Sequence, residues 1–406
     1  MEAAAAHPTS PDLASPGPAS RGSDRRRSRV GLVLTGGGAR AAYQVGVVKA
    51  VRDILGSPVR NPFPIVCGTS AGAINAAALA VFADDFTRAV ASLLEVWENM
   101  RCEHVYRTDA WSIARSGARW LLALMLVSRR NPVSLLDNAP LRDLIAKSLD
   151  FGRIQENIDR GALYAACVTA SGYTSGQSVS FFQGGSALEG WERNQRVGAA
   201  VPLGVDVLLA STALPFLFPA VKFNREYFGD GSMRQIAPVS PALHLGAERV
   251  LVVGTGREPA GGTRARSNTY PSLAQIAGHA LNSIFLDSLM VDIERLQRIN
   301  RTLALIPPER LEGAELQLRP VEVLYISPSE PIERIASRFI HRLPGTVRFI
   351  LRPTGALNRS GSNLASYLLF EQGFCRALID LGYRDTLERE AEVRAFFEPS
   401  RSTAHV

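Results

Sequence analysis

The stretch PIVCGTSAGAIN, residues 64–75, ends an apolar run abruptly in a serine that is held between two glycines. Ile65–Cys67 is typical of a buried β-strand, and the alanine-rich run Ala71–Val81 is typical of a helix. An earlier β-rich run, Val30–Leu34, is followed by apolar residues that recur at the helical period up to Leu55. The order β-α-β-α predicts a parallel sheet that is covered by helices.

Further along the chain, the pattern predicts a few more strands and then mostly helices. Strands are expected over residues 163–169, 179–182 and 249–253 with a hairpin over 221–228, and helices over 205–212, 273–300, 332–341, 364–381 and 386–397. We therefore expect an α/β fold with an open, mainly parallel sheet, flanked by helices in three layers, and a helical C-terminal extension. The expected division is a disordered tail (1–28), an α/β domain (29–256), a linker (257–271) and the helical extension (272–406).

The composition is ordinary for a globular protein, with 406 residues, 46% hydrophobic and 20% charged, and a formal net charge of +7. The basic excess forms no dense stripe with interleaved aromatic residues, so nucleic-acid binding is not indicated, whereas mild attraction to anionic lipid is compatible with it. The four cysteines lack CxxC or zinc-ligand spacing, so we expect a reducing compartment and no metal. The N-terminus lacks the order of a signal peptide, and the apolar run near Trp111–Val127 is shorter than the roughly 20 residues of a spanning helix. These features predict a cytoplasmic protein.

The letters GTSAG fit the pattern G-x-S-x-G in the strand–turn–helix context that this pattern requires. The five residues are Gly68, Thr69, Ser70, Ala71 and Gly72. A serine in such a cramped turn projects its oxygen, the glycines avoid collisions with neighbouring backbone, and the following helix start favours a developing anion. Ser70 is therefore a candidate nucleophile, although a plain tight turn that packs a small-residue helix would have the same pattern.

A glycine-rich loop, Gly36–Ala41, follows the first strand. Its backbone N–H groups, at the start of a helix, can donate hydrogen bonds to a bound anion. One use would be a dinucleotide phosphate site, and the other an oxyanion hole for a tetrahedral acyl intermediate. A dinucleotide site also needs an acidic residue at the end of the second strand, where Ser70 stands instead, and this disfavours the dinucleotide. Arg40 in this loop would either approach the anion or anchor the loop by a salt bridge.

The general base has two interpretations. Asp230 lies between Gly229 and Gly231 at the end of the expected hairpin, where a carboxylate is presented without bulk around it. A serine–acid–histidine triad would add His244 or His279 after this aspartate. His244 falls in a short helical turn before an apolar strand, which is typical of a packed or exposed helix histidine. A β-turn without catalytic function is also typical of the sequence GDGS.

Together these features make the chain resemble the patatin-like phospholipase family. The resemblance is carried by TGGGARAAYQVGVV, GTSAG, the DG pair at Asp230 and the preceding ASTALPFLFPAV, and it covers about residues 30–254. The later stretches NSIFLDSLMVDIERLQRIN and SYLLF are similar to the C-terminal part of bacterial members. The resemblance implies that residues 29–256 form the catalytic domain.

The resemblance also implies a serine hydrolase of fatty-acyl esters of phospholipids or other lipids, as a phospholipase A, a lysophospholipase or a broader esterase, without a cofactor or metal. In a Ser-Asp dyad, Ser70 would attack the ester carbonyl and Asp230 would accept its proton. The oxyanion would be held by the loop residues Gly36, Gly37, Gly38, Ala39 and Arg40. Peripheral contact with a membrane is implied as well. The alternative is a catalytically weak lipid-binding or regulatory protein with the same fold.

Two positions depart from the family's usual pattern. Ala41 stands where glycine is usual, and Ser232 replaces the Gly or Ala that follows the DG pair. A hydrogen bond from Ser232 to Asp230 would lower the basicity of the carboxylate and so predicts weak activity. The apolar segment Trp111–Val127 is a candidate lid or interfacial segment, with a buried helix that covers the sheet as the alternative.

Overall fold

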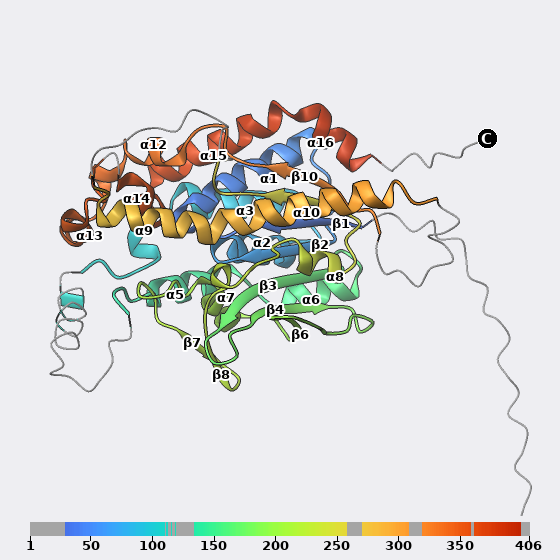
Figure 1. Ribbon diagram of the computed structural model, residues 1–406, viewed down its shortest axis with the longest axis horizontal. Helices are drawn as coiled ribbons and strands as arrows, with labels where there is room; N and C mark the ends of the chain where they lie inside the picture. Colours follow the sequence, from blue (N-terminus) through green and yellow to red (C-terminus); the bar gives the residue numbers. More distant parts are fainter. Residues whose placement is uncertain are drawn as a thin grey trace, which may run out of the picture.

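The computed structural model describes residues 29–109, 134–257, 270–307, 319–358 and 361–398, with isolated positions between 111 and 118. Within these described ranges, ten strands form one sheet in the order β10-β9-β1-β2-β3-β4-β6-β5, with β7 and β8 off this path (Figure 1). The strands are β1 Val30–Leu34, β2 Ile65–Thr69, β3 Ala165–Gly172, β4 Ser178–Gly184, β5 Trp191–Arg193, β6 Arg196–Ala200, β7 Val221–Phe223, β8 Glu226–Asp230, β9 Arg249–Val253 and β10 Glu322–Ile326.

The centre of the sheet is parallel. β1 pairs in parallel with β2 and β9, β2 pairs with β3, and β9 pairs with β10. Every residue of β1, β2 and β9 is buried, because both faces of the sheet are covered. The remaining strands add four antiparallel pairs and one parallel pair, β4 with β6, at one side. The expected mainly parallel α/β sheet is therefore confirmed at the centre of the sheet.

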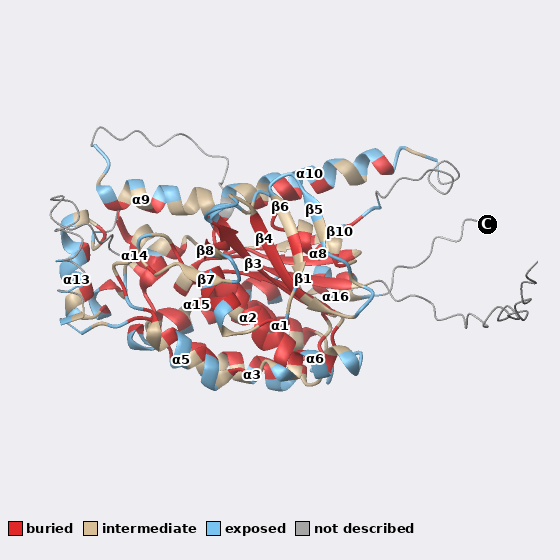
Figure 2. Ribbon diagram, turned by 90° about the horizontal axis from the view of Figure 1, so that it is seen from below, coloured by how far each residue is buried: buried red, intermediate tan, exposed pale blue. Residues whose placement is uncertain are grey.

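The helices cover both faces of the sheet and give three layers (Figure 2). They are α1 Ala42–Ile54, α2 Ala71–Val81, α3 Phe86–Glu98, α5 Ala139–Ser148, α6 Gly152–Asp159, α7 Val205–Thr212, α8 Ser240–His244, α9 Leu273–Asn282, α10 Ser288–Leu303, α12 Ile332–Ala336, α13 Gly345–Leu351, α14 Ser362–Leu368, α15 Gln372–Leu387 and α16 Glu390–Phe397. Alternate residues of β1 enter different cores: Leu32 and Leu34 pack with α1, α2 and α15, whereas Val33 packs with α8 and α10.

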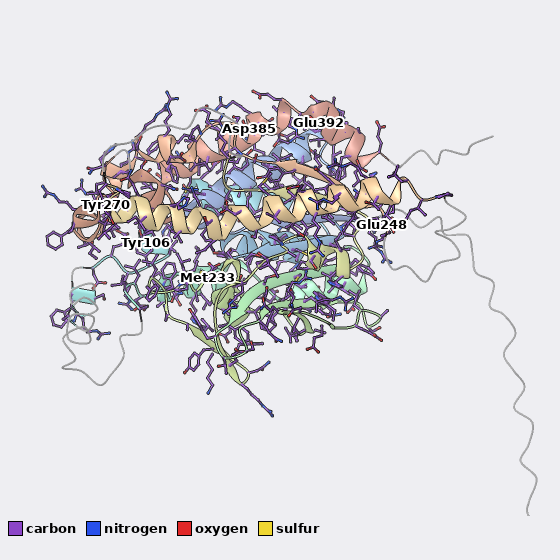
Figure 3. The ribbon with its side chains drawn as sticks, viewed as in Figure 1. Tyr106, Met233, Glu248, Tyr270, Asp385 and Glu392 are labelled. Carbon is purple, nitrogen blue, oxygen red and sulfur yellow. The ribbon has the colours of Figure 1, made fainter. Side chains whose placement is uncertain are left out.

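The C-terminal region is helical as expected, but it also contributes a strand that the sequence analysis missed. β10 extends the sheet beside β9, with Glu322 opposite Arg249 and Ile326 opposite Val253. α15 packs on α1, where the Tyr43 hydroxyl donates to Asp385 at 3.0 Å (Asp385 is labelled in Figure 3). The C-terminal region therefore shares the sheet and the core of the preceding region. The expected domain boundaries stay a prediction, and residues 1–28 and 258–269 lie outside the described residues.

Several elements differ from the expectation. The helix expected over 332–341 ends at Ala336, as α12, and the helix expected over 386–397 is divided between the end of α15 and α16. The single helix expected over 364–381 is two helices, α14 and α15, and Glu371 caps the second by accepting a hydrogen bond from the amide of Phe374. The helix expected over 273–300 consists of α9 and α10, joined by a π-helical turn over Ser283–Asp287. The short strands β5 and β6 were not expected, because residues 191–200 are mostly exposed or half-buried and show no strand-like alternation of apolar and polar residues.

Candidate active site

Ser70 stands at the junction between β2 and α2, in a backbone conformation that is rare for a residue with a side chain. Its φ of 55° and ψ of −130° interrupt the passage from strand to helix. A Cβ atom at Gly68 would collide with the carbonyl oxygen of Gly72, and one at Gly72 would collide with the carbonyl oxygen of Leu34. The two glycines are therefore required by close backbone approach, which allows the tight turn that presents Ser70.

A neighbouring serine on α7, which the sequence analysis did not single out, supports this turn. The hydroxyl of Ser211 accepts a hydrogen bond from the amide of Ser70 at 2.9 Å and donates to the carbonyl of Thr169 at 2.6 Å. Ser211 is fully buried. It thus ties the turn to β3, and its only signal in the sequence is its place in the motif ASTALPFLFPAV.

The sheet topology brings Asp230 to the same place. β2 lies alongside β3 as far as the pair Thr69–Thr169. Beyond that pair, β8 pairs with β3 in the antiparallel direction, and its last residue, Asp230, stands opposite Ala170. The carboxyl ends of β2 and β8 therefore meet head to head beside β3, and Ser70 and Asp230 line one cavity.

Asp230 is almost completely buried, with 1% of its surface exposed, and burial raises the pKa of its carboxyl group to about 6. The nearby Ser70 hydroxyl and the groups of Ser232 lower this pKa by less than burial raises it. The Oδ1 atom accepts a hydrogen bond from the amide of Ser232 at 2.9 Å. The Oδ2 atom has no partner among the described residues, so it is available to accept a proton.

Ser232 lowers the pKa of Asp230, as the sequence-based expectation has it, but burial raises this pKa by more. The backbone amide of Ser232 makes the hydrogen bond to the carboxylate, whereas its hydroxyl has no partner among the described residues. Because burial is the largest effect, the net result is a stronger base than an ordinary aspartate. Ala41, the other departure, has a helical φ of −64°, so this position has no need of glycine.

The glycine loop lies beside the two side chains. Gly38 lines the same cavity as Ser70 and has a φ of 55°, which favours glycine. A short helical turn, Gly38–Ala41, begins there, and the amide of Arg40 donates to the carbonyl of Gly37 at 3.1 Å. Among the described residues, no acceptor is paired with the amides of Gly38 and Ala39, as expected at the start of a helix.

The guanidinium group of Arg40 anchors this loop, and among the described residues Arg40 is not one of those that line the cavity. It is buried, and it donates to Ser366 at 2.7 Å, to Asn282 at 3.3 Å and to both the carbonyl and the side chain of Asn363. It also lies 3.9 Å from the centre of the Tyr367 ring. These partners are neutral, so the expected salt bridge is wrong, and all of them belong to the C-terminal region.

The histidine alternatives are not supported by their positions. His244 stacks on Trp191, with 4.8 Å between ring centres, and burial lowers its pKa to about 4. His279 is exposed on α9. No histidine of the described residues lines the cavity that holds Ser70 and Asp230. A search of the same residues finds no cluster of His, Cys, Asp or Glu that could hold a metal ion.

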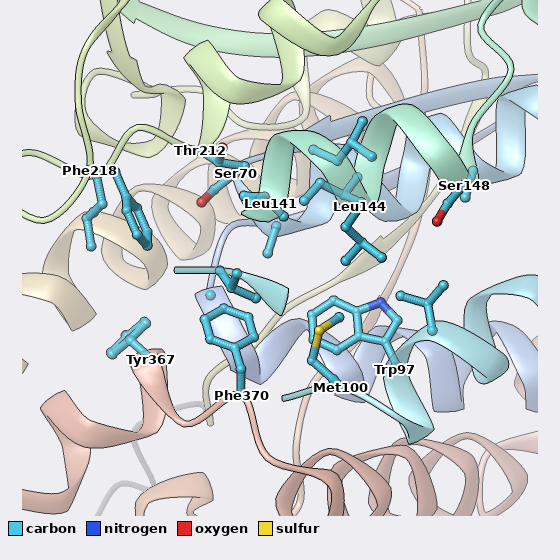
Figure 4. Close-up of a pocket in the computed structure, with 18 of the residues that line it drawn as sticks. Ser70, Trp97, Met100, Leu141, Leu144, Ser148, Thr212, Phe218, Tyr367 and Phe370 are labelled. Carbon is cyan, nitrogen blue, oxygen red and sulfur yellow. The ribbon is translucent and has the colours of Figure 1, made fainter. Parts of the chain in front are cut away.

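The cavity itself is narrow and apolar (Figure 4), with a volume of about 80 Å³. α2, α3 and α5 supply one part of its wall, and the C-terminal region supplies Phe285, Tyr367, Leu368 and Phe370. Sequence analysis missed this wall because its parts are far apart in the chain. Of the candidate lid, Trp111 is described and is 76% exposed, whereas residues 119–127 lie outside the described residues.

The sequence matches the family described as patatin-like phospholipase over residues 32–243. A cGAMP-activated phospholipase of Pseudomonas aeruginosa is 29% identical over 234 residues, which cover 55% of this chain and 61% of that protein. A cUMP-AMP-activated phospholipase of Escherichia coli is 48% identical over 50 residues, which cover 12% of this chain and 16% of that protein. The chain therefore matches less than two thirds of the length of either relative.

Two solved structures are similar at low identity. VipD of Legionella pneumophila is 13% identical with a TM-score of 0.30, and the comparison covers 93% of this chain and 89% of that chain. Human GIVD cytosolic phospholipase A2, in complex with methyl gamma-linolenyl fluorophosphonate, is 14% identical with a TM-score of 0.34, and the comparison covers 91% of this chain and 59% of that chain.

Proposed function

Because this chain belongs to the patatin-like phospholipase family, we propose that it hydrolyses fatty-acyl esters of phospholipids through a Ser-Asp dyad. One observation supports this proposal most strongly. Ser70, in its strained turn, and the buried carboxylate of Asp230 line the same narrow apolar cavity. A nucleophile beside a base, at an apolar cavity, is the arrangement that an acyl hydrolase needs.

In the proposed mechanism, the Ser70 hydroxyl attacks the ester carbonyl while Oδ2 of Asp230 accepts its proton. The tetrahedral intermediate collapses, the alcohol leaves with the proton from Asp230, and the acyl group stays on Ser70. Water then attacks the acyl-enzyme and passes a proton to Asp230, which returns it to Ser70 as the fatty acid leaves. Since the pKa of Asp230 is about 6, the carboxylate is mostly ionised at neutral pH and is more basic than an ordinary aspartate.

The negative charge of both tetrahedral intermediates needs hydrogen-bond donors. We assign this role to the glycine loop, chiefly to the backbone amides of Gly38 and Ala39, which have no acceptor among the described residues. One such donor contributes roughly 3–4 kcal/mol to the stabilisation of the transition state in well-studied hydrolases. The Arg40 guanidinium is assigned to anchoring the loop.

The test is hydrolysis of p-nitrophenyl esters and of phosphatidylcholine by the wild type, Ser70→Ala and Asp230→Asn. We expect both variants to lose activity by at least a thousandfold, and Ser70→Ala to lose labelling by a fluorophosphonate. His244→Ala is the matched control and should keep its activity. A folded wild type that turns over no ester would favour the alternative, a lipid-binding or regulatory protein with this fold.

We also propose that the activity responds to a cyclic dinucleotide. Both relatives are named for such activation, one by cGAMP and the other by cUMP-AMP. The same ester assay, with and without each nucleotide, tests this point. A rate that neither nucleotide changes would contradict it and would leave the proposed chemistry intact.

Finally, we propose a cytoplasmic protein that contacts a phospholipid membrane at its periphery. Large apolar side chains are exposed on α9 and α13, among them Leu273, Ile276 and Phe349, and Tyr270 lies at the same end of the molecule (Figure 3). The helix Leu273–Leu303 is long and apolar enough to cross a membrane by length and composition, but its inner face packs on the sheet through Leu289 and other residues. Leu273→Glu with Phe349→Glu should reduce co-sedimentation with anionic vesicles, while hydrolysis of a soluble short ester stays unchanged.

A further inference from the structure

Two buried polar atoms without a hydrogen-bond partner lie in one turn at the end of β8. Among the described residues five buried side-chain nitrogen or oxygen atoms lack a partner, and two of them are Oδ2 of Asp230 and Oγ of Ser232. Asp230 is the N-cap of the short helical turn Gly231–Met233 that contains Ser232. Buried polar atoms nearly always have a partner, in the protein or in ordered water. Two such atoms in one turn therefore suit a small polar molecule that binds both.

The hydroxyl of Ser232 lies beside the glycine loop and the wall of the cavity. A Cβ atom at Gly36 would collide both with Oγ of Ser232 and with the ring of Phe285. Phe285 lines the cavity that holds Ser70 and Asp230. The side chain of Ser232 is also close enough to the carboxyl group of Asp230 to lower its pKa. The hydroxyl thus stands between the candidate base and the loop to which we assign the oxyanion.

The two hydrogen-bonding groups of Ser232 have separate roles. Its backbone amide donates to Oδ1 of Asp230 at 2.9 Å and so orients the carboxylate. A glycine or an alanine at this position would supply the same amide without a hydroxyl. The hydroxyl is 7% exposed with its residue and makes no hydrogen bond among the described residues, so this turn does not depend on it.

We propose that the hydroxyl of Ser232 positions the water molecule that hydrolyses the acyl-enzyme. This inference rests on the proposed function, because the water attacks an acyl group on Ser70. The water donates one hydrogen bond to Oδ2 of Asp230 and the other to Oγ of Ser232, which leaves a lone pair of its oxygen for the acyl carbonyl. As the new C–O bond forms, the first proton passes to Asp230. The bond to Ser70 then breaks, Ser70 takes this proton, and the fatty acid leaves.

The proposed role affects only the second half of the reaction, because water takes part only after the acyl-enzyme has formed. For such a two-step reaction kcat/KM reports the formation of the acyl-enzyme, whereas its breakdown contributes to kcat alone. Loss of the hydroxyl should therefore lower kcat and KM by the same factor and leave kcat/KM unchanged. A change that misplaced Asp230 would lower kcat/KM as well, since the same carboxylate is the base of the first step.

The test follows p-nitrophenyl butyrate by stopped flow and the acyl-enzyme by intact-protein mass spectrometry. In Ser232→Ala the first turnover should release p-nitrophenol at the wild-type rate. The butyryl group should then leave Ser70 at least tenfold more slowly, about the effect of one lost hydrogen bond to a reacting group, so the variant accumulates butyryl-enzyme. Ser232→Gly lacks the same hydroxyl and should show the same slow step. Ser178→Ala, which removes a buried hydroxyl on β4, is the matched control and should keep both rates.

The outcomes separate this inference from the proposed chemistry. A butyryl-enzyme that forms on Ser70 and decays at the wild-type rate in Ser232→Ala would overturn the inference and leave the proposed function intact. Equal slowing of both steps in a variant with the native circular dichroism spectrum would overturn it too, because the hydroxyl would then act through the dyad as a whole. A wild type that releases no p-nitrophenol and forms no acyl-enzyme would contradict the proposed function itself.

Discussion

The buried carboxylate of Asp230 makes a measurable prediction about stability. Burial raises its pKa from the ordinary 3.8 to about 6, so the folded state holds the ionised form less favourably than the unfolded chain does. Between these two pKa values the folded protein binds more protons than the unfolded one, and stability therefore falls as the pH rises. Asp230→Asn removes the charge and should stabilise the protein while it removes the activity.

The magnitude follows from the size of the pKa shift. At 1.36 kcal/mol for each pKa unit, the free energy of unfolding of Asp230→Asn should exceed that of the wild type by about 3 kcal/mol at pH 8 and by about 1.5 kcal/mol at pH 5. The difference should disappear below the ordinary pKa, where both states are protonated. If catalysis requires the buried, destabilised carboxylate of Asp230, the inactive variant Asp230→Asn should be more stable than the active wild type.

Denaturant unfolding of the wild type and Asp230→Asn at pH 5 and pH 8 is the appropriate assay, with retention of the native circular dichroism spectrum as a check. Asp143→Asn, at an exposed position on α5, is the matched control. It should change the free energy of unfolding only slightly, and by the same amount at both pH values. An Asp230→Asn variant that is no more stable than the wild type at pH 8 would refute the reasoning. A gain of equal size at both pH values would refute it as well.

Three further predictions concern the groups around the dyad. The kcat/KM for a short ester should rise roughly tenfold from pH 5 to pH 7 and then level off, since the ionised fraction of Asp230, with its pKa of about 6, rises through that window; a flat profile would argue against this base. Arg40→Met should lower kcat at least tenfold with little change in KM, because the glycine loop loses its hydrogen bonds to α9 and α14, and Arg40→Lys should restore only part of it; an unchanged kcat would show that the loop needs no such anchor. Ser211→Ala should lower the free energy of unfolding by about 2 kcal/mol, since the amide of Ser70 and the carbonyl of Thr169 lose a buried partner. Urea unfolding measures this difference, and a variant as stable as the wild type would contradict the prediction.

The elements around Ser70 could be recognised from the sequence because each has a local signature. The serine between two glycines is needed where a strand turns sharply into a helix, since a side chain at Gly68 or Gly72 would collide with backbone atoms of the same region. The glycine loop and the DG pair are likewise short patterns at the ends of apolar strands. Their order along the chain was enough to identify the family.

What remained hidden depends on contacts between distant segments. The expectation for Arg40 could not choose between an anion and an anchor, because its partners Asn282, Asn363 and Ser366 lie more than 200 residues away. The strand β10 was missed since only its pairing with β9 distinguishes it from other short apolar runs. The sequence also predicted that Ser232 would weaken Asp230, but burial, a property of the whole fold, has the larger effect.

The sequence alone identified the candidate groups of this site: a serine in a tight turn, a glycine loop and an aspartate, each in a pattern set by local backbone sterics. Only the tertiary structure decided where these groups meet and what surrounds them. β8 continues along β3 from the point where β2 ends, and this places Asp230 next to Ser70. The C-terminal helices anchor the glycine loop and complete the apolar cavity. The sequence could not predict these contacts, because they depend on proximity in space and have no local sequence pattern.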